Sequence, residues 1–358
     1  DGKFRGLFTL LFGAGIYLFM ERAWARGAGR GLQARRLIFL MLFGLVHYFL
    51  IWRGDILFSY AVAGLLALLF IRFSPRKQMI IGALGYILGG LFYAISMVFM
   101  QITADGPVPD NAELAEVQED FQSAAETDLA DGRLETTIRQ DGSYSEFVSH
   151  TVKEHGTNPL ASSWLIIFET LPLMLIGMAL YKLGIVTASR SLKFYRLNGI
   201  LGVIIGALIC GAGAMLSKQN GVVIPEFTTV YRFPNYWGAL VLAWGYVCLV
   251  MWLVKVAGNN WQGAVVNYLA PVGQMALSNY LLQTVLCCAI FYGWGLGLFG
   301  ELQRSSLTLI VIAIWAVQLG FSRWWLSRFS SGPMERVWRN LTQRRWQPVL
   351  QRRARQAA

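Results

Sequence analysis

Residues 37–71 read LIFLMLFGLVHYFLIWRGDILFSYAVAGLLALLFI, and this stretch decides the fold class. It holds two apolar runs, Leu37–Trp52 and Ile56–Ile71, joined by the short segment Arg53–Asp55. A helix of about 20 apolar residues spans a bilayer, and inside lipid only helices and closed barrels satisfy their own backbone groups. Barrel strands would alternate in polarity, which these runs do not do. The stretch therefore predicts two membrane helices joined by a tight turn.

Similar apolar runs fill most of the chain. Of its residues, 55% are hydrophobic and 14% are charged, and the mean hydropathy is +0.47, which excludes an ordinary soluble domain. The pattern predicts an all-α, polytopic transmembrane helix bundle with nine spans in this chain and at least one more upstream of Asp1. The predicted spans are Phe4–Met20, Leu37–Trp52, Ile56–Ile71, Met79–Met100, Leu160–Tyr181, Leu197–Leu216, Tyr236–Val254, Pro271–Phe291 and Leu307–Leu326.

The charges divide the chain into parts and orient it. Residues 101–159 carry thirteen acidic side chains and only three basic ones, so the net charge of +11 comes from the rest of the chain. Most basic residues lie in alternate loops and at the C-terminal end, which the positive-inside rule places in the cytoplasm. We expect a multi-pass protein of the bacterial inner membrane with a cytoplasmic C-terminus. The predicted parts are four N-terminal spans (1–100), an acidic extracytoplasmic loop (101–159), five C-terminal spans (160–326) and a basic amphipathic cytoplasmic tail (327–358).

The acidic loop and the tail lie outside the predicted spans. In the loop, Glu113–Asp128 and Leu134–Val148 are predicted as short surface helices. The loop either gates a site beneath it or merely stays clear of the lipid headgroups through its charge. In the tail, Pro333–Arg355 interleaves basic and aromatic residues and is predicted to lie on the membrane surface. Basic cytoplasmic loops explain the sequence pI of about 9.7, so the expected partners are membrane lipids and not nucleic acid. Homo-oligomerisation is left open.

The cysteines point to no metal or redox chemistry. Cys210, Cys248, Cys287 and Cys288 all fall within predicted spans, where free cysteine behaves as a small hydrophobic residue. Their spacing is not that of metal ligands or of a disulfide framework. No metal site and no permanently bound cofactor is predicted.

The hairpin at Arg53–Asp55 carries the first of three polar clusters. An ionisable side chain in the middle of a bilayer costs about 2.5 to 3.5 kcal/mol on insertion scales, so it usually faces a cavity or a partner. His47 is predicted one or two helical turns deeper than Asp55. An imidazole near a carboxylate suits a general base or a proton relay, which makes these two the candidate catalytic residues. The alternative is a turn ion pair above a structural histidine.

The other two clusters also lie in predicted spans. Ser278, Asn279 and Gln283 place polar groups on the eighth span, where they either bind a substrate carbonyl or hold helices together. Glu169 on the fifth span requires a partner, because an unpaired buried carboxylate is costly. Arg5 and Arg53 are the candidate partners.

Several motifs resemble those of the YeiB-like family of uncharacterised bacterial membrane proteins. The N-terminal ones are Lys3–Gly15 (KFRGLFTLLFGAG), Leu42–His47 (LFGLVH) and Arg53–Tyr60 (RGDILFSY). The C-terminal ones are Met275–Gln283 (MALSNYLLQ), Phe321–Leu326 (FSRWWL) and Gly332–Arg339 (GPMERVWR). The resemblance covers nearly the whole chain outside the acidic loop. Two departures are Met334–Arg336, where the family tends to show Leu-Glu-Trp, and the lack of a helix with Asp-x-x-Arg-Gly before Lys3.

The resemblance implies a function. The family is distantly similar to transmembrane acyltransferases of the heparan-alpha-glucosaminide N-acetyltransferase and acyltransferase-3 types. These move an acyl group from a cytoplasmic thioester donor to a hydroxyl or amine acceptor on the far side, with a histidine implicated. That histidine belongs near the helix that does not precede Lys3 here, so His47 is a candidate and not a transferred residue. The implied partners are an acyl-CoA-type donor and an extracytoplasmic acceptor.

On this hypothesis His47 and Asp55 transfer protons during an acyl transfer. The predicted substrate-binding residues are Arg5, Arg53, Glu169, Ser278, Asn279 and Gln283. The predicted donor-binding residues, at the cytoplasmic mouth, are Arg30, Arg35 and Arg36. Two alternatives remain: a permease or exporter of a small or lipid-linked solute, and a non-catalytic lipid-binding membrane protein.

Overall fold

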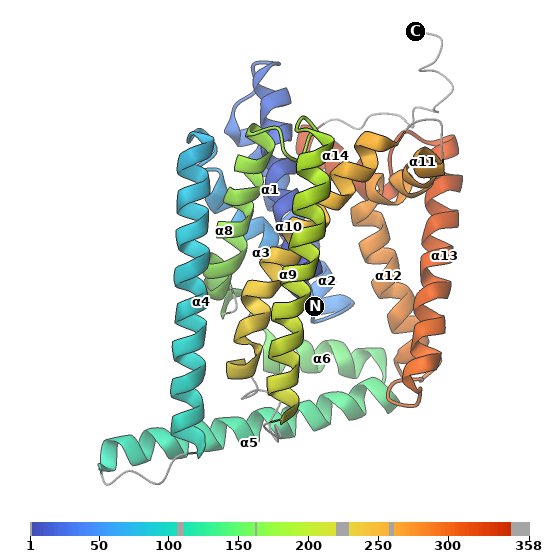
Figure 1. The fold of residues 1–358 in the computed structure, drawn as a ribbon. Helices are drawn as coiled ribbons and strands as arrows, with labels where there is room; N and C mark the ends of the chain where they lie inside the picture. The colour runs from blue at the N-terminus through green and yellow to red at the C-terminus, as the bar shows by residue number, and fades with distance from the viewer. Residues whose placement is uncertain (1, 106–110, 162, 220–228, 258–260, 345–358) are drawn as a thin grey trace. The chain divides into compact units, whose positions relative to one another are not determined.

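The computed structural model describes residues 2–105, 111–161, 163–219, 229–257 and 261–344. Within these ranges the chain forms α-helices and no β-strand, which confirms the all-α prediction. The helices are α1 (Gly2–Trp24), α2 (Arg30–Leu50), α3 (Leu57–Ala67), α4 (Pro75–Asp105), α5 (Ala112–Asp141), α6 (Tyr144–His155), α7 (Asn158–Ala161), α8 (Ser163–Lys182), α9 (Leu192–Gln219), α10 (Thr229–Val256), α11 (Trp261–Gln274), α12 (Ala276–Phe291), α13 (Arg304–Arg328) and α14 (Pro333–Gln343) (Figure 1).

The predicted count of nine spans is not confirmed. Among the described residues, six helices are long and apolar enough to cross a membrane, which fits a multi-pass membrane protein: α1, α2, α4, α9, α10 and α13. Counting the bent pair α11–α12 as one broken span raises the number among the described residues to seven. One difference is α3, which has 11 residues and is therefore only about 16 Å long at helical rise. After Ala67 the chain continues in tight turns instead of helix.

The eighth predicted span, Pro271–Phe291, is wrong as a continuous helix. It is broken at Met275, and the axes on either side of the break differ by 76°. Pro271 lies inside α11 and lacks a backbone donor, and Met275 has non-helical dihedrals of φ −111° and ψ 31°. The break gives α12 an N-terminus of its own, whose N–H groups need partners.

The acidic segment is more helical than predicted. Its first part is a single helix, α5, of 30 residues, because Ala, Glu, Gln and Leu dominate it and have high helix propensity. Glu113 in the first turn and Arg139 in the last suit the helix dipole. The predicted helix Leu134–Val148 is interrupted, because Ser143 starts α6 in a capping box with Glu146.

The chain divides into two compact units, and each is described by itself. Unit 1 comprises Asp1–Ala25, Ala63–Asp131 and Ser163–Val256, and unit 2 comprises Arg26–Val62, Gly132–Ser162 and Ala257–Ala358. The two polar clusters described below belong one to each unit.

In unit 1, α1 packs against α8 and α10, α4 packs against α8 and α10, and α9 lies along α10 (Figure 1). The core includes Leu10, Leu173 and Tyr195. The contact of α9 with α10 depends on glycine, because a Cβ at Gly202 would lie 2.7 Å from Gly245 Cα. Small residues at such positions allow two membrane helices to pack closely.

In unit 2, α2 packs against α6 and α14, and α12 packs against α11, α13 and α14. A small core forms around Phe147, Cys288 and Tyr292. Within the predicted surface segment Pro333–Arg355, the structure describes α14 up to Gln343 and Arg344 after it. The rest of that segment, from Arg345 on, lies outside the described residues.

Candidate functional site

The turn between α2 and α3 brings His47 next to Asp55. The N–H groups of Ile51 and Trp52 both donate to the His47 carbonyl, at 2.9 and 2.8 Å, and so end α2. Asp55 Oδ2 accepts the N–H of Phe58 at 2.9 Å, which satisfies one of the free donors at the start of α3. The carboxylate is therefore held in place by the backbone of the helix that follows it.

Gly44 lets the start of α3 approach α2 closely. A Cβ at this position would overlap the backbone nitrogen of Phe58 and lie 2.8 Å from Asp55 Oδ2. His47 is three residues further along α2 and therefore on the same face. The absence of a side chain at Gly44 thus sets the distance between the imidazole and the carboxylate.

His47 and Asp55 form a buried pair. His47 Nδ1 lies 2.9 Å from Asp55 Oδ1, and the two side chains are 0% and 1% exposed. An ionised carboxylate only accepts hydrogen bonds, so Nδ1 of His47 is the donor in this contact. Nε2 is buried and finds no hydrogen-bond partner in the part of the chain that the structure describes. Such an atom is uncommon and costly, and it marks a place for a ligand, a water molecule or a transferred proton.

Two aromatic side chains cover His47. The centroid of its ring lies 5.0 Å from that of Tyr280 and 6.2 Å from that of Trp52. The Tyr280 hydroxyl accepts the N–H of Ile56 and donates to Asp55 Oδ1, both at 3.4 Å. Tyr280 is therefore tied to the pair from the side of α12.

The same two side chains line a cavity of about 570 Å³, here termed the larger cavity. Most of its walls are apolar side chains from α12 and from the loop before α13, including Phe291, Phe299 and Leu302. A volume of this size and a mainly apolar lining are typical of small-molecule sites. A ligand in the larger cavity would lie against the side chains that cover His47.

A smaller cavity, of about 210 Å³, meets Asp55 directly and is also lined by Tyr48 and Arg53. Arg53 Nη2 lies 2.5 Å from Glu135 Oε2, and Arg139 pairs with the other oxygen of the same carboxylate. Glu135 of the acidic segment is buried and bridges two guanidinium groups. Arg53, one of the two candidate partners of Glu169, is therefore paired with Glu135.

Ser278 and Glu335 cap each other's helices. The N–H and Oγ of Ser278 donate to the two oxygens of Glu335, at 3.0 and 2.5 Å. In return, the N–H of Met334 donates to Ser278 Oγ at 3.0 Å. Side-chain acceptors and negative charge are both stabilising at helix N-termini, and here those of α12 and α14 share them. Two of the motifs that carried the family resemblance meet at this contact, which explains Ser278 without a substrate.

Asn279 joins α12 to its neighbours. Its Nδ2 donates to Ser322 Oγ at 2.9 Å and to the Val272 carbonyl at 3.1 Å, and its own carbonyl accepts from Gln318 Nε2 at 2.9 Å. These are helix-to-helix contacts of the kind that the alternative interpretation predicted. Gln283, by contrast, is exposed and lines the larger cavity.

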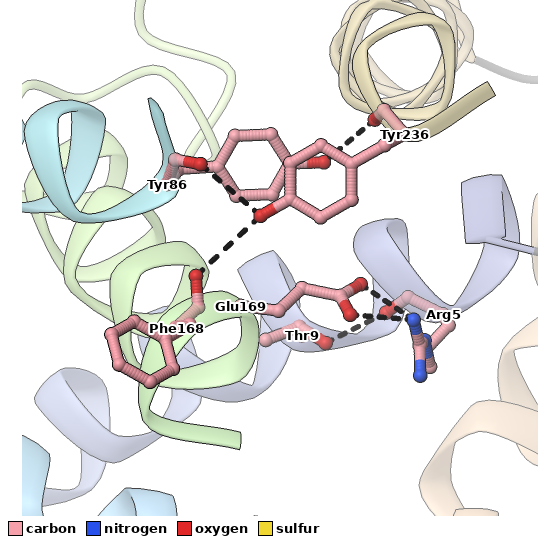
Figure 2. A network of polar contacts seen from close by, with 6 residues as sticks. All are labelled: Arg5, Thr9, Tyr86, Phe168, Glu169 and Tyr236. Carbon is pink, nitrogen blue, oxygen red and sulfur yellow. Dashed lines mark hydrogen bonds and ion pairs between the residues drawn. The ribbon is translucent and has the colours of Figure 1, made fainter. Parts of the chain in front are cut away.

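Arg5 and Glu169 form an ion pair in unit 1, so of the two candidate partners of Glu169 it is Arg5 that pairs with it (Figure 2). Arg5 Nη2 lies 2.7 and 2.6 Å from the two carboxylate oxygens. The Arg5 side chain is 54% exposed and that of Glu169 is 14% exposed. Since the other candidate site residues belong to unit 2, this pair is a cluster of its own.

Two tyrosines complete the cluster of unit 1. Tyr86 and Tyr236 stack with centroids 4.3 Å apart, and each hydroxyl donates to the other's carbonyl, at 2.7 and 3.2 Å (Figure 2). The Tyr236 hydroxyl also lies 3.5 Å from the Phe168 carbonyl. Pro172, four residues later in α8, has no N–H for that carbonyl, so the tyrosine replaces the missing helical donor. These contacts serve the backbone of the bundle.

The predicted donor-binding residues lie in the first turns of α2. Arg35 Nη1 donates to the Thr342 carbonyl at 3.2 Å. The Arg36 guanidinium lies 4.1 Å from the centroid of the Trp338 ring, and Trp338 Nε1 donates to the Arg36 carbonyl at 2.7 Å. α14 therefore packs on this end of α2. The role of Arg30, Arg35 and Arg36 in donor binding stays a prediction.

Several residues around the pair were not among the predicted site residues. Glu135 and Arg139 come from the acidic segment, where their i, i+4 spacing is the only signal that ties them together. Tyr280 lies in a motif that carried the family resemblance. Neither signal indicates contact with the hairpin, because that contact joins residues far apart in the chain.

Comparison with known proteins gives the family but no activity. A family model described as "Protein of unknown function (DUF418)" matches residues 180–345. YxaH of Bacillus subtilis (strain 168), an "Uncharacterized protein", is 30% identical over 97% of this chain and 80% of its own length. YeiB of Escherichia coli (strain K12), described in the same words, is 30% identical over 99% of this chain and 85% of its own length.

A protein of Bacillus acidopullulyticus, described as an "Uncharacterized 39.9 kDa protein in amylase 3'region", is 25% identical over 98% of this chain and 82% of its own length. No solved structure matches. Because two relatives are 30% identical over almost the whole chain, the chain belongs to the YeiB-like family.

Proposed function

We propose that this chain is a membrane acyltransferase in which His47 and Asp55 move a proton between an acceptor and an acyl thioester. The observation that carries the proposal is the buried pair itself, with Nδ1 of His47 bonded to the carboxylate and Nε2 left without a partner among the described residues. A histidine oriented by a carboxylate is the usual arrangement of a general base.

The proposed step is a single acyl transfer. His47 Nε2 takes the proton of an acceptor hydroxyl or amine while the acceptor atom attacks the thioester carbonyl. The C–S bond breaks, the new ester or amide bond forms, and the thiolate leaves with the proton that the imidazolium returns. Asp55 stays ionised throughout and stabilises the imidazolium that forms in between.

Access to His47 requires a side chain to move. The imidazole is buried under Tyr280 and Trp52, so the acceptor reaches Nε2 when one of these rings turns toward the larger cavity. In this proposal Gln283 contacts the acyl carbonyl and Arg53, beside Asp55 in the smaller cavity, binds an anionic part of the acceptor. The donor enters from the cytoplasm past Arg30, Arg35 and Arg36, and the acceptor lies on the outer side of the bacterial inner membrane, with the C-terminus in the cytoplasm.

The test uses the full chain reconstituted into vesicles of total bacterial lipid, with acetyl-CoA or palmitoyl-CoA as donor. The first readout is release of the free thiol. The second is acyl addition to lipid, which is measured by mass spectrometry. His47→Gln is expected to lower both rates about 10² to 10⁴-fold, the usual contribution of a general base. His150→Gln, a second buried histidine exchanged in the same way, is the control and keeps the wild-type rate.

Equal rates in the wild type and His47→Gln, or no thiol release with either donor, would contradict the proposal. Movement of a solute down its gradient without thiol release would favour a permease instead. An effect of His47→Gln on stability alone would favour a lipid-binding protein without turnover.

A further inference from the structure

We infer that the larger cavity of unit 2 binds the hydrocarbon chain of an anionic amphiphile whose carboxylate or phosphate group pairs with Arg139. The binding itself does not depend on catalysis. Only the role of the amphiphile as a substrate rests on the proposed function.

The walls of the larger cavity suit a hydrocarbon chain. Phe291, Tyr292, Leu298, Phe299 and Leu302 line it, together with the rings of Trp52 and Tyr280. Apolar surface of this kind is stabilised by an apolar occupant. Polar groups form the smaller part of the lining, and one of them, the Thr284 hydroxyl, already donates to the Tyr280 carbonyl at 3.1 Å.

Arg139 supplies the charge for the headgroup. It lies in the cavity wall, with its guanidinium 5.9 Å from the ring centroid of Tyr292 and 5.7 Å from that of Phe299. Glu135, its carboxylate partner, also pairs with Arg53, so the two oxygens of one carboxylate are divided between two guanidinium groups. An anionic headgroup would give Arg139 a second anionic partner.

The Nε atom of Arg139 gives a second, independent indication. It is buried, and no hydrogen-bond acceptor for it occurs among the residues that the structure describes. Glu135 is bonded through the terminal nitrogen of the guanidinium, so Nε–H remains a donor. Arginine binds carboxylate and phosphate oxygens through several N–H groups at once, and a ligand oxygen would satisfy this one.

The experiment measures photo-crosslinking of a diazirine fatty acid to the purified full chain in neutral detergent. Peptide mapping is expected to place the label on residues of the larger cavity. Arg139→Gln is expected to lower labelling by the fatty acid about tenfold or more, because a charge-assisted contact is lost. Labelling by the uncharged methyl ester of the same probe should change little. Arg328→Gln, which removes an exposed arginine at the end of α13, is the control for lost charge.

A second variant keeps the inference testable if Arg139→Gln does not fold. Leu302→Trp, in the loop before α13, is expected to fill the cavity and abolish labelling by both probes while the melting temperature of the protein stays near that of the wild type. Competition by unlabelled fatty acid alone would identify a carboxylate headgroup, and competition by lysophosphatidic acid would identify a phosphate. Either result supports the inference.

Label outside the cavity, or undiminished labelling of Leu302→Trp, would overturn the inference. His47→Gln separates it from the proposed function. If both the inference and the proposed function are correct, this variant should be fully labelled but release no thiol. Full labelling together with wild-type thiol release would contradict the proposed function and leave the inference intact. If Leu302→Trp loses labelling but keeps full thiol release, the amphiphile is a bound ligand and not a substrate of the proposed reaction.

Discussion

The His47–Asp55 pair of unit 2 and the Arg5–Glu169 pair of unit 1 solve the same problem in different ways. Each places ionisable groups inside a helical bundle, where they need partners. In unit 1 both oxygens of Glu169 contact Arg5, whose side chain is half exposed, and the neighbouring tyrosines bond to backbone carbonyls. In unit 2 both partners are fully buried, yet one nitrogen of His47 is left over.

This difference separates a structural cluster from a candidate functional one. Sequence analysis assigned roles at a site to both pairs, catalysis to His47 and Asp55 and substrate binding to Arg5 and Glu169. What distinguishes them is the buried Nε2 of His47, which has no partner among the described residues and lies under two side chains that line a cavity. The predictions below test this contrast, from the largest expected effect to the smallest.

Removing the carboxylate should cost unit 2 far more stability than unit 1. Asp55→Ala leaves a buried imidazole unpaired and takes away the N-terminal contact of α3, so the free energy of unfolding should fall by about 3 to 5 kcal/mol. Glu169→Ala leaves a half-exposed arginine and should cost about 1 kcal/mol or less. Thermal unfolding in detergent measures both. Equal losses would mean that the two pairs play the same structural role.

Gly44→Ala tests whether close approach of α2 and α3 positions the pair. The added Cβ overlaps the Phe58 nitrogen, and the strain should cost about 1 to 3 kcal/mol. Any acyl transfer should fall as well, because Asp55 must shift. The matched control is Gly15→Ala in α1, where no atom lies within 4 Å of the new Cβ, and there stability should stay the same or rise slightly. An unchanged Gly44→Ala protein would contradict this account of the site.

Ser278 and Glu335 should behave as one unit. Ser278→Ala and Glu335→Gln should each cost about 1 kcal/mol, because the first removes the acceptor of the Met334 N–H and the second removes the negative charge and one of two acceptor oxygens at the start of α12. The double variant should lose less than the sum, with a coupling of about 0.5 to 3 kcal/mol. A double-mutant cycle of thermal unfolding measures the coupling. Strict additivity would show that the two caps act independently.

The capping box of α6 predicts the smallest effect. The backbone N–H and then the hydroxyl of Ser143 lower the pKa of the Glu146 carboxyl below its ordinary value. Because the pKa is lower in the folded state, the stabilisation is present above the ordinary glutamate pKa and is lost as the pH falls through the folded value. The protection of backbone amides at the start of α6 against hydrogen exchange should therefore rise less with pH in Glu146→Gln than in the wild type. Identical pH profiles would rule out this contribution.

Sequence patterns determined a large part of the fold. Apolar runs predicted an all-α membrane protein, because lipid admits few other structures, and they located α1, α2, α4, α9, α10 and α13. His47 and Asp55 were predictable as a pair, because the three-residue turn between the two predicted helices keeps the end of one helix and the start of the next close together.

Other features depended on contacts between distant residues. The bend at Met275 creates a new helix end, and the side chain of Glu335 caps it. Glu335 is far from Met275 in the chain, so the sequence did not show this contact. Hydropathy could not show that α3 stops at Ala67, since an apolar run is compatible with helix and with turns alike.

For the site, sequence alone identified the chemistry and tertiary structure decided the surroundings. His47 and Asp55 lie within one hairpin, where side chains meet over a short distance in sequence. The pairing of an imidazole with a carboxylate could therefore be predicted from the sequence. Whether Nε2 has a partner, and whether Arg53 pairs with Glu135 or with Glu169, depends on which helices pack together. That packing is set by the shapes of many side chains at once, and no local pattern encodes it.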